Sequence, residues 1–123
     1  MDIKKKVMVI DDDKEFLDEM VETLRLAGYD PISIPESVNA VKEVIQVKPN
    51  IILLDLKMAK KSGFKVADEL MEKPETKDIP IIAITGVFTA QEHSLLMKIC
   101  NIKDCLIKPI NPLDVIHQIE KSI

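Results

Sequence analysis

The stretch VMVIDDDKEF, residues 7–16, places four apolar residues directly before three consecutive aspartates. A short apolar run rich in branched side chains is typical of a strand that is buried on both faces of a parallel sheet. The residues after it have helical spacing, with an apolar face at Phe16, Leu17, Met20, Val21 and Leu24. Gly28 is expected to end this helix. The stretch therefore predicts a turn from strand to helix that carries three carboxylates.

The same order of strand and helix continues to the end of the chain. Further strands are predicted at PISI (31–34), IILL (51–54), IIAI (81–84) and CLI (105–107), all but the first as buried runs. Two helical faces are predicted in the middle of the chain: Val38, Val41 and Ile45 after an N-cap at Ser37, and Phe64, Ala67, Leu70 and Met71 before Pro74. A third is predicted at Leu95, Leu96 and Ile99 after a capping box at Thr89–Glu92. The last is predicted at Ile116, Ile119 and Ile123 after the cap and proline of Asn111-Pro112. Five such units predict one α/β domain over residues 1–123, a twisted parallel sheet with helices on both faces.

The composition excludes several classes of protein. Hydrophobic residues make up 46% and charged residues 31% of the chain, an ordinary globular balance. A net charge of −4 and an aromatic content of 3% argue against direct binding of nucleic acid. No apolar run approaches the roughly 20 residues of a membrane span, and the first apolar run is too short for a signal peptide, so we expect a cytoplasmic protein. Cys100 and Cys105 are expected to be small buried side chains rather than a disulfide or a zinc site.

Polar side chains stand at the carboxyl ends of four predicted strands, where open parallel sheets bind their ligands. They are Asp11, Asp12 and Asp13 after the first strand, Asp55 after the third, Thr85 and Gly86 after the fourth, and Lys108 after the fifth. Asp13 is expected to cap the following helix. Two carboxylates about 4–5 Å apart repel by roughly 4 kcal/mol at an effective dielectric constant of 20, so Asp11, Asp12 and Asp55 together need protonation, a cation, or both. A set of donors made of oxygens alone suits Mg²⁺. The two charges of Mg²⁺ and the one of Lys108 would neutralise three carboxylates and prepare the edge for an anion such as a phosphoryl group.

Four segments together, VIDDD, IILLDLKM, AITG and CLIKP, in this order and at these spacings, closely resemble the receiver domains of two-component response regulators. The resemblance covers essentially the whole chain. Within the family, the chain is similar to stand-alone regulators of chemotaxis and sporulation. It implies a (βα)5 flavodoxin-like, doubly wound parallel sheet with strand order 2-1-3-4-5. It also implies a signalling phosphoacceptor that catalyses only its own phosphorylation and dephosphorylation, rather than an enzyme with other substrates.

The resemblance assigns a role to each polar residue at the sheet edge. Asp55 would be phosphorylated by a sensor histidine kinase, a histidine phosphotransfer protein or a small phosphodonor. Asp12, Asp55 and the backbone carbonyl of Lys57 would bind Mg²⁺ (or Mn²⁺) directly, and Asp11 would act mainly through water in the metal shell.

The remaining roles concern the phosphoryl group. Lys108 would pair with its oxygens, Thr85 would move in to donate a hydrogen bond, and Gly86 would leave the approach to Asp55 open. The bond between Lys108 and Pro109 is expected to be cis.

The sequence departs from the family pattern at the switch. Cys105 stands where the family usually has an aromatic residue, three positions before the lysine, so the usual coupling of Thr85 to the output face is in question. That face comprises the fourth helix, the fifth strand and the fifth helix, including Val87, Phe88, Lys103 and Cys105, and is expected to bind a downstream effector. Lys57 and Val87, two residues beyond Asp55 and Thr85, predict slow self-dephosphorylation.

Three other classes remain open. An aspartyl phosphatase or phosphotransferase usually has a second acid two residues after its nucleophile, where this chain has Lys57. A flavodoxin-type cofactor carrier would need a phosphate loop rich in Ser, Thr and Gly in place of three aspartates. A receiver that works only as an interaction module is favoured by Cys105 and opposed by Asp55, Thr85 and Lys108. A monomer or a weak phosphorylation-dependent dimer is expected, without membrane or DNA binding.

Overall fold

The computed structural model describes residues 3–86, 89, 91 and 102–123. It contains one sheet of five parallel strands in the order β2-β1-β3-β4-β5, which confirms the predicted strand order and the flavodoxin-like fold. The strands are β1 (Lys6–Ile10), β2 (Asp30–Ile34), β3 (Ile51–Asp55), β4 (Ile81–Thr85) and β5 (Ile102–Ile107). The helices are α1 (Lys14–Leu26), α2 (Ala40–Val47), α3 (Gly63–Glu72) and α5 (Pro112–Ser122). The helix predicted from Thr89 to Ile99 lies almost entirely outside the described residues, as do Cys100 and His93.

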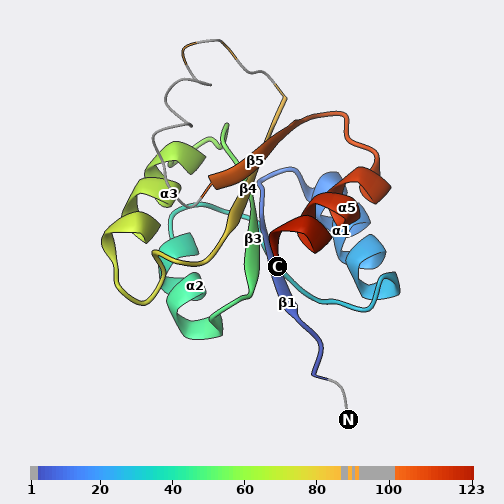
Figure 1. The fold of residues 1–123 in the computed structure, drawn as a ribbon. Coiled ribbons are helices and arrows are strands. Elements are labelled where there is room, and N and C mark those ends of the chain that lie inside the picture. The colour runs from blue at the N-terminus through green and yellow to red at the C-terminus, as the bar shows by residue number, and fades with distance from the viewer. Residues whose placement is uncertain (1–2, 87–88, 90, 92–101) are drawn as a thin grey trace.

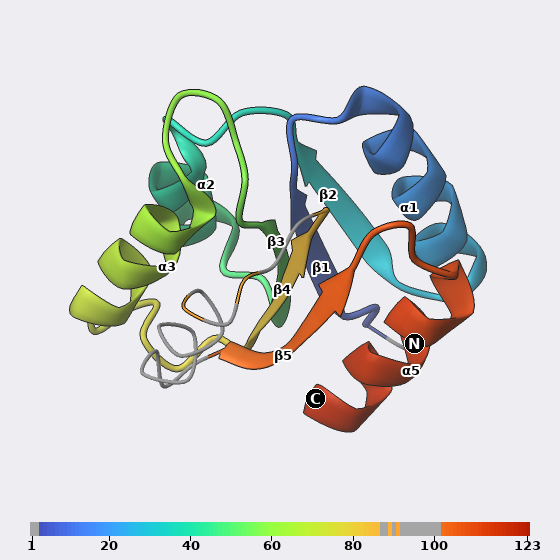
Figure 2. The same cartoon turned by 90° about the horizontal axis from the view of Figure 1, so that it is seen from above.

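The sheet is the middle of three layers. Figure 1 shows α2 and α3 on one side of it and α1 and α5 on the other, and Figure 2 shows the same division from above. Successive residues of a strand point to opposite faces, so Met8, Ile52 and Leu54 pack against α2 and α3, whereas Val9 and Leu53 pack against α1 and α5. The central strands β1 and β3 are therefore covered on both faces, which explains their continuous apolar sequence.

Three helix starts follow from local sequence. Asp13 caps α1, as predicted, because its Oδ1 accepts a hydrogen bond from the Phe16 N–H at 3.2 Å. Asn111 caps α5 in the same way, with Pro112 in the first turn. Ser62 caps α3, a role that the sequence had not indicated. The predicted end of α1 is also confirmed, since Gly28 follows it with φ of 95°, a conformation that favours glycine.

The predicted start of α2 is wrong. The helix begins at Ala40 rather than after Ser37, and no side-chain cap is present. Ser37 is buried instead, and its Oγ accepts a hydrogen bond from the Lys61 N–H at 3.1 Å, which joins the β2–α2 loop to the β3–α3 loop. Val38 precedes the helix and is half exposed, so it does not belong to the buried face. Tertiary contact between two loops has replaced the local cap.

Two predicted burial patterns also differ from the structure. The run of residues 105–107 lies in β5, an edge strand of the sheet, and is only partly buried, with Ile107 56% exposed. β5 pairs with β4 alone, so its side chains have neighbouring strand residues on one side only and are less enclosed than those of β1, β3 and β4. In α5 the fully buried side chains are Val115 and Ile119, whereas Ile123 is 39% exposed. Within the described residues no helix is both long enough and apolar enough to span a membrane.

Candidate functional site

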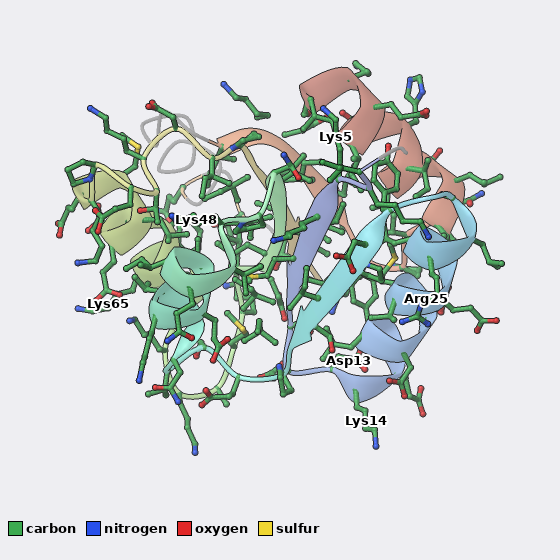
Figure 3. All side chains as sticks on the ribbon, turned by 90° about the horizontal axis from the view of Figure 1, so that it is seen from below. Lys5, Asp13, Lys14, Arg25, Lys48 and Lys65 are labelled. Carbon is green, nitrogen blue, oxygen red and sulfur yellow. The ribbon has the colours of Figure 1, made fainter. Side chains whose placement is uncertain are left out.

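Three carboxylates meet at the carboxyl ends of β1 and β3, which are neighbours in the sheet. One oxygen each from Asp11, Asp12 and Asp55 lies within 4.8 Å of the others. Asp11 is 1% and Asp55 5% exposed, whereas Asp12 is open to solvent. Figure 3 shows Asp13, the third aspartate of the run, where the chain leaves β1 and enters α1. The sequence prediction that these residues converge agrees with this geometry.

Backbone amides orient each of the three carboxylates. Asp11 Oδ1 accepts a hydrogen bond from the Asp13 N–H at 2.9 Å, and Asp55 Oδ1 accepts one from the Lys57 N–H at 3.1 Å. Asp12 Oδ2 accepts from the Ala59 N–H at 3.1 Å, a contact between the β1–α1 and β3–α3 loops. One oxygen of each carboxylate is thus held by a backbone N–H, from the carboxylate's own turn for Asp11 and Asp55 and from another loop for Asp12. The carboxylates are oriented by backbone before any ligand is bound.

Lys108 extends into this cluster from the loop after β5. Its Nζ lies 2.7 Å from Asp11 Oδ2 and 4.0 Å from both Asp55 Oδ2 and Asp13 Oδ2. Its backbone N–H donates to the Thr85 carbonyl at 2.7 Å, which ties the β5–α5 loop to the end of β4. The Lys108-Pro109 bond is cis, as predicted. Four strand ends therefore contribute to one edge.

Burial makes the charge on Asp55 costly. Removal from water, together with the nearby Asp11, raises the pKa of Asp55 from 3.8 to about 6, against the opposing effects of the Lys57 N–H and the Lys108 ammonium. When all three carboxylates are ionised, Lys108 offsets only one of their charges. The site therefore has an excess of negative charge that a bound cation would relieve.

The side chains present fit a divalent cation of the Mg²⁺ type. All the donors are oxygens, the kind of ligand that Mg²⁺ prefers. Asp11 Oδ2 is buried and, although it lies close to the Lys108 ammonium, accepts no well-directed hydrogen bond. The Lys108 ammonium offsets the charge of this oxygen, so the excess negative charge of the cluster comes from the other carboxylates. A pocket of about 170 Å³, lined by Asp12, Ser37, Met58 and Ala59 among others, opens beside the cluster.

The predicted switch residues lie farther along the sheet. Thr85 ends β4 and is fully buried. Cys105 lies in β5 opposite Ala83 and is half buried, packed against Leu56 and Ala83. The side chain of Lys57 is exposed. Val87 and Phe88, predicted for the output face, lie outside the described residues.

Sequence reasoning missed one neighbour of the cluster. The ring centroid of Phe16 lies 4.3 Å from Lys108 Nζ. Phe16 had been assigned only to the apolar face of α1, which it also serves. No local signal indicates this contact, because it joins the first turn of α1 to the loop after β5.

Comparison with known proteins places this chain in a family. The model of the response regulator receiver domain matches residues 7–120. The DNA-binding dual master transcriptional regulator RpaA of Synechocystis is 31% identical over 71% of this chain and 36% of its own length. The probable transcriptional regulator ycf27 of Porphyridium aerugineum is 30% identical over 91% of this chain and 45% of its own length. The chain thus spans less than half of these relatives.

Solved structures agree with the family model. The chemotaxis protein CheY4 of Vibrio cholerae has a TM-score of 0.91 at 20% identity, covering 98% of this chain and all of that one, which supports the fold. The receiver domain of a DNA-binding response regulator (merR) from Colwellia psychrerythraea has a TM-score of 0.86 at 27% identity, covering 96% of this chain and 97% of that one. The chain belongs to the response regulator receiver domain family.

Proposed function

We propose that Asp55 is the residue through which this domain, taken as residues 1–123, receives a phosphoryl group. Receiver domains are phosphoacceptor signalling domains of two-component systems, and this chain is one of them. The observation that supports Asp55 is its position: a buried carboxylate at the end of the central strand β3, within 4.8 Å of two other carboxylates and 4.0 Å from an ammonium. A buried acid with a perturbed pKa at a ligand-binding sheet edge is a candidate for chemistry.

The geometry favours Oδ2 of Asp55 as the nucleophile. The Lys57 N–H holds Oδ1, whereas Oδ2 faces Lys108. In the proposed step an Asp55 oxygen attacks phosphorus, the new bond is O–P, and the bond from phosphorus to the donor breaks. With a phosphohistidine donor, the imidazole nitrogen leaves with the electron pair and takes a proton. Lys108 would pair with the phosphoryl oxygens, and Thr85 would donate a hydrogen bond to one of them.

Mg²⁺ or Mn²⁺ is the proposed cofactor. Asp12, Asp55 and the backbone carbonyl of Lys57 would hold it, with Asp11 acting through water. The metal would supply positive charge that offsets the charge of the entering phosphoryl group. The fit described above, three convergent oxygen donors of whose charges Lys108 offsets only one, supports this proposal.

The partners follow from the same proposal. The donor would be a sensor histidine kinase or a histidine phosphotransfer protein, and the domain would catalyse only its own phosphorylation and dephosphorylation. A downstream effector would bind the face that includes β5 and α5, where Cys105 replaces the usual aromatic residue. The domain would work in the cytoplasm as a monomer or a weak dimer and would not bind DNA itself.

Mass spectrometry of the intact protein tests the proposal. Incubation with acetyl phosphate or phosphoramidate in Mg²⁺ is expected to add a single phosphoryl group. The gain should disappear without the metal and in Asp55→Asn. Absence of any gain in the wild-type protein would favour the interaction-module class, and a gain that persists in Asp55→Asn would assign the acceptor elsewhere.

Asp12→Ala is expected to raise the dissociation constant for Mg²⁺ about tenfold or more, because it removes a proposed direct ligand. Isothermal titration with MgCl₂ measures this. Asp13→Asn is the matched control: it removes a charge from the same run, keeps an oxygen for capping Phe16, and lies outside the carboxylate cluster. Unchanged Mg²⁺ affinity in Asp12→Ala would remove Asp12 from the proposed ligand set.

Slow loss of the phosphoryl group is expected from the sequence. Lys57, two residues after Asp55, has an exposed side chain that can cover the phosphoryl group without positioning a water molecule. The second residue invoked, Val87, lies outside the described part of the chain. Rapid removal of the phosphodonor on a desalting column, followed by mass spectra over time in Mg²⁺ buffer, should show a phosphorylated species that persists for minutes. Loss within seconds would contradict the prediction.

A further inference from the structure

We propose that Phe16 is a positioning residue for Lys108, holding the ammonium group over its ring and so aiming it at the phosphoryl site. The inference rests on the proposed function of Lys108 and adds a residue to it. The distance of 4.3 Å between Lys108 Nζ and the ring centroid is within the range of a cation–π contact.

The surroundings of the ammonium explain why such a contact is useful. On one side Lys108 Nζ faces Asp11 at 2.7 Å, with Asp55 and Asp13 at 4.0 Å. On the other side is an open hollow of about 450 Å³ between α1 and the β5–α5 loop. Lysine is a strongly hydrated point charge on a flexible stem, so without a fixed contact on that side it can turn toward the solvent.

The hollow also offers competing partners. Its lining includes the carboxylates of Glu15 and Glu19, one turn apart on α1, besides Phe16 and Lys108 themselves. Either glutamate could pair with a lysine that had turned outward. The ring of Phe16 attracts the ammonium without neutralising it and offers no oxygen that would compete with a phosphoryl group. It thus favours the inward position and leaves the positive charge available.

The backbone fixes the ring in place. The Phe16 N–H donates to Asp13 Oδ1, and Asp13 Oδ2 is one of the carboxylate oxygens facing Lys108. The ring also packs against the buried cluster formed by β1, β3, β4, α1 and α5. The first turn of α1 therefore presents an aromatic face and a carboxylate to the same ammonium from a rigid helix start.

The test compares Phe16→Leu with Phe16→Tyr. Leucine keeps the apolar packing and removes the ring face, so the second-order rate constant for phosphorylation by acetyl phosphate should fall about three- to tenfold. Tyrosine keeps the ring face, so Phe16→Tyr should retain most of the wild-type rate constant. Phe64→Leu, the same change on α3 and so on the opposite face of the sheet from α1 (Figure 1), is the control for a general packing defect.

A nuclear magnetic resonance readout separates this inference from the proposed function. A ring 4.3 Å from the ammonium should shift the resonances of the Lys108 ε-methylene group upfield, and Phe16→Leu alone should remove the shift. If Phe16→Leu loses this shift but is phosphorylated at the wild-type rate, the positioning role is wrong. If the wild-type protein takes up no phosphoryl group while the shift is present, the proposed function fails and the contact stands without it.

Discussion

Asp55→Asn is expected to abolish phosphoryl uptake and, in the absence of metal, to make the folded protein more stable. The first effect follows from loss of the nucleophile. The second follows from the pKa of Asp55, which burial, as the main cause, and the neighbouring Asp11 raise from 3.8 to about 6, so that the ionised carboxylate is disfavoured in the folded state. A difference of about two pKa units corresponds to roughly 3 kcal/mol, and we expect a gain of about 2–3 kcal/mol near neutral pH.

The same shift predicts a pH dependence. The unfolded chain releases the Asp55 proton near pH 4 and the folded protein near pH 6, so between these values the folded state binds more protons. The contribution of Asp55 to the free energy of unfolding is therefore full below about pH 4, falls as the pH rises to about 6, and stays low above. Because Asp55 and Asp11 interact, the fall belongs to the pair.

Urea denaturation in EDTA from pH 4 to 8 measures both effects. The stability of the wild-type protein minus that of Asp55→Asn should decline across this window, and saturating Mg²⁺ should raise the wild-type stability more than that of the variant. Asp68→Asn, at an exposed position on α3, should change stability by only about 0.5 kcal/mol or less. A metal-free Asp55→Asn that is less stable than the wild-type protein would show that the carboxylate is stabilised where it lies.

Gly63→Ala is expected to be the most destabilising single substitution near the site, with a loss of about 3 kcal/mol or more. An added Cβ would lie 2.1 Å from the Asp55 carbonyl oxygen, 2.7 Å from Leu56 Cα and 2.9 Å from the Asp55 carbonyl carbon. All three are backbone atoms, so no change of rotamer relieves the overlap. The start of α3 would have to move away from the end of β3, and the Gly63 N–H bond to the Leu56 carbonyl would be strained or lost.

Gly86→Ala is the matched control for stability. Among the described residues, a Cβ added at Gly86 would meet no heavy atom within 4 Å. We expect a change of about 0.5 kcal/mol or less in urea denaturation followed by circular dichroism. If Gly63→Ala were as stable as Gly86→Ala, the close approach of α3 to the backbone of Asp55 would be wrong.

The alternation of strands and helices and the edge that carries the site were predictable because each rests on local sequence, whereas the strand order was implied by the resemblance to receiver domains. Apolar runs with branched residues mark β1, β3 and β4, and the carboxyl end of every parallel strand must lie at one edge. The cap at Asp13 was also predictable, since it depends on residues three apart. These features require no knowledge of which loops touch.

The features that were missed depend on contacts between distant segments. Serine is a residue type favoured at N-caps, but the hydroxyl of Ser37 accepts a hydrogen bond from the backbone N–H of Lys61, 24 residues away. Ile107 was predicted to be buried because an apolar run does not show whether its strand lies at the edge or in the middle of the sheet. The structure places it in the edge strand, where it is exposed. The stacking of Lys108 on Phe16 joins residues 92 positions apart, and nothing in either segment alone indicates it.

The hydrogen bond between Asp12 and the Ala59 N–H gives one carboxylate two tasks. Asp12 is a proposed ligand of the metal and also an anchor of the β3–α3 loop. If binding of the metal strengthens this anchor, thermodynamic reciprocity requires that a better ordered loop raises metal affinity by the same factor. Substitutions in the loop that never touch the metal could then tune the concentration of metal at which the domain becomes competent.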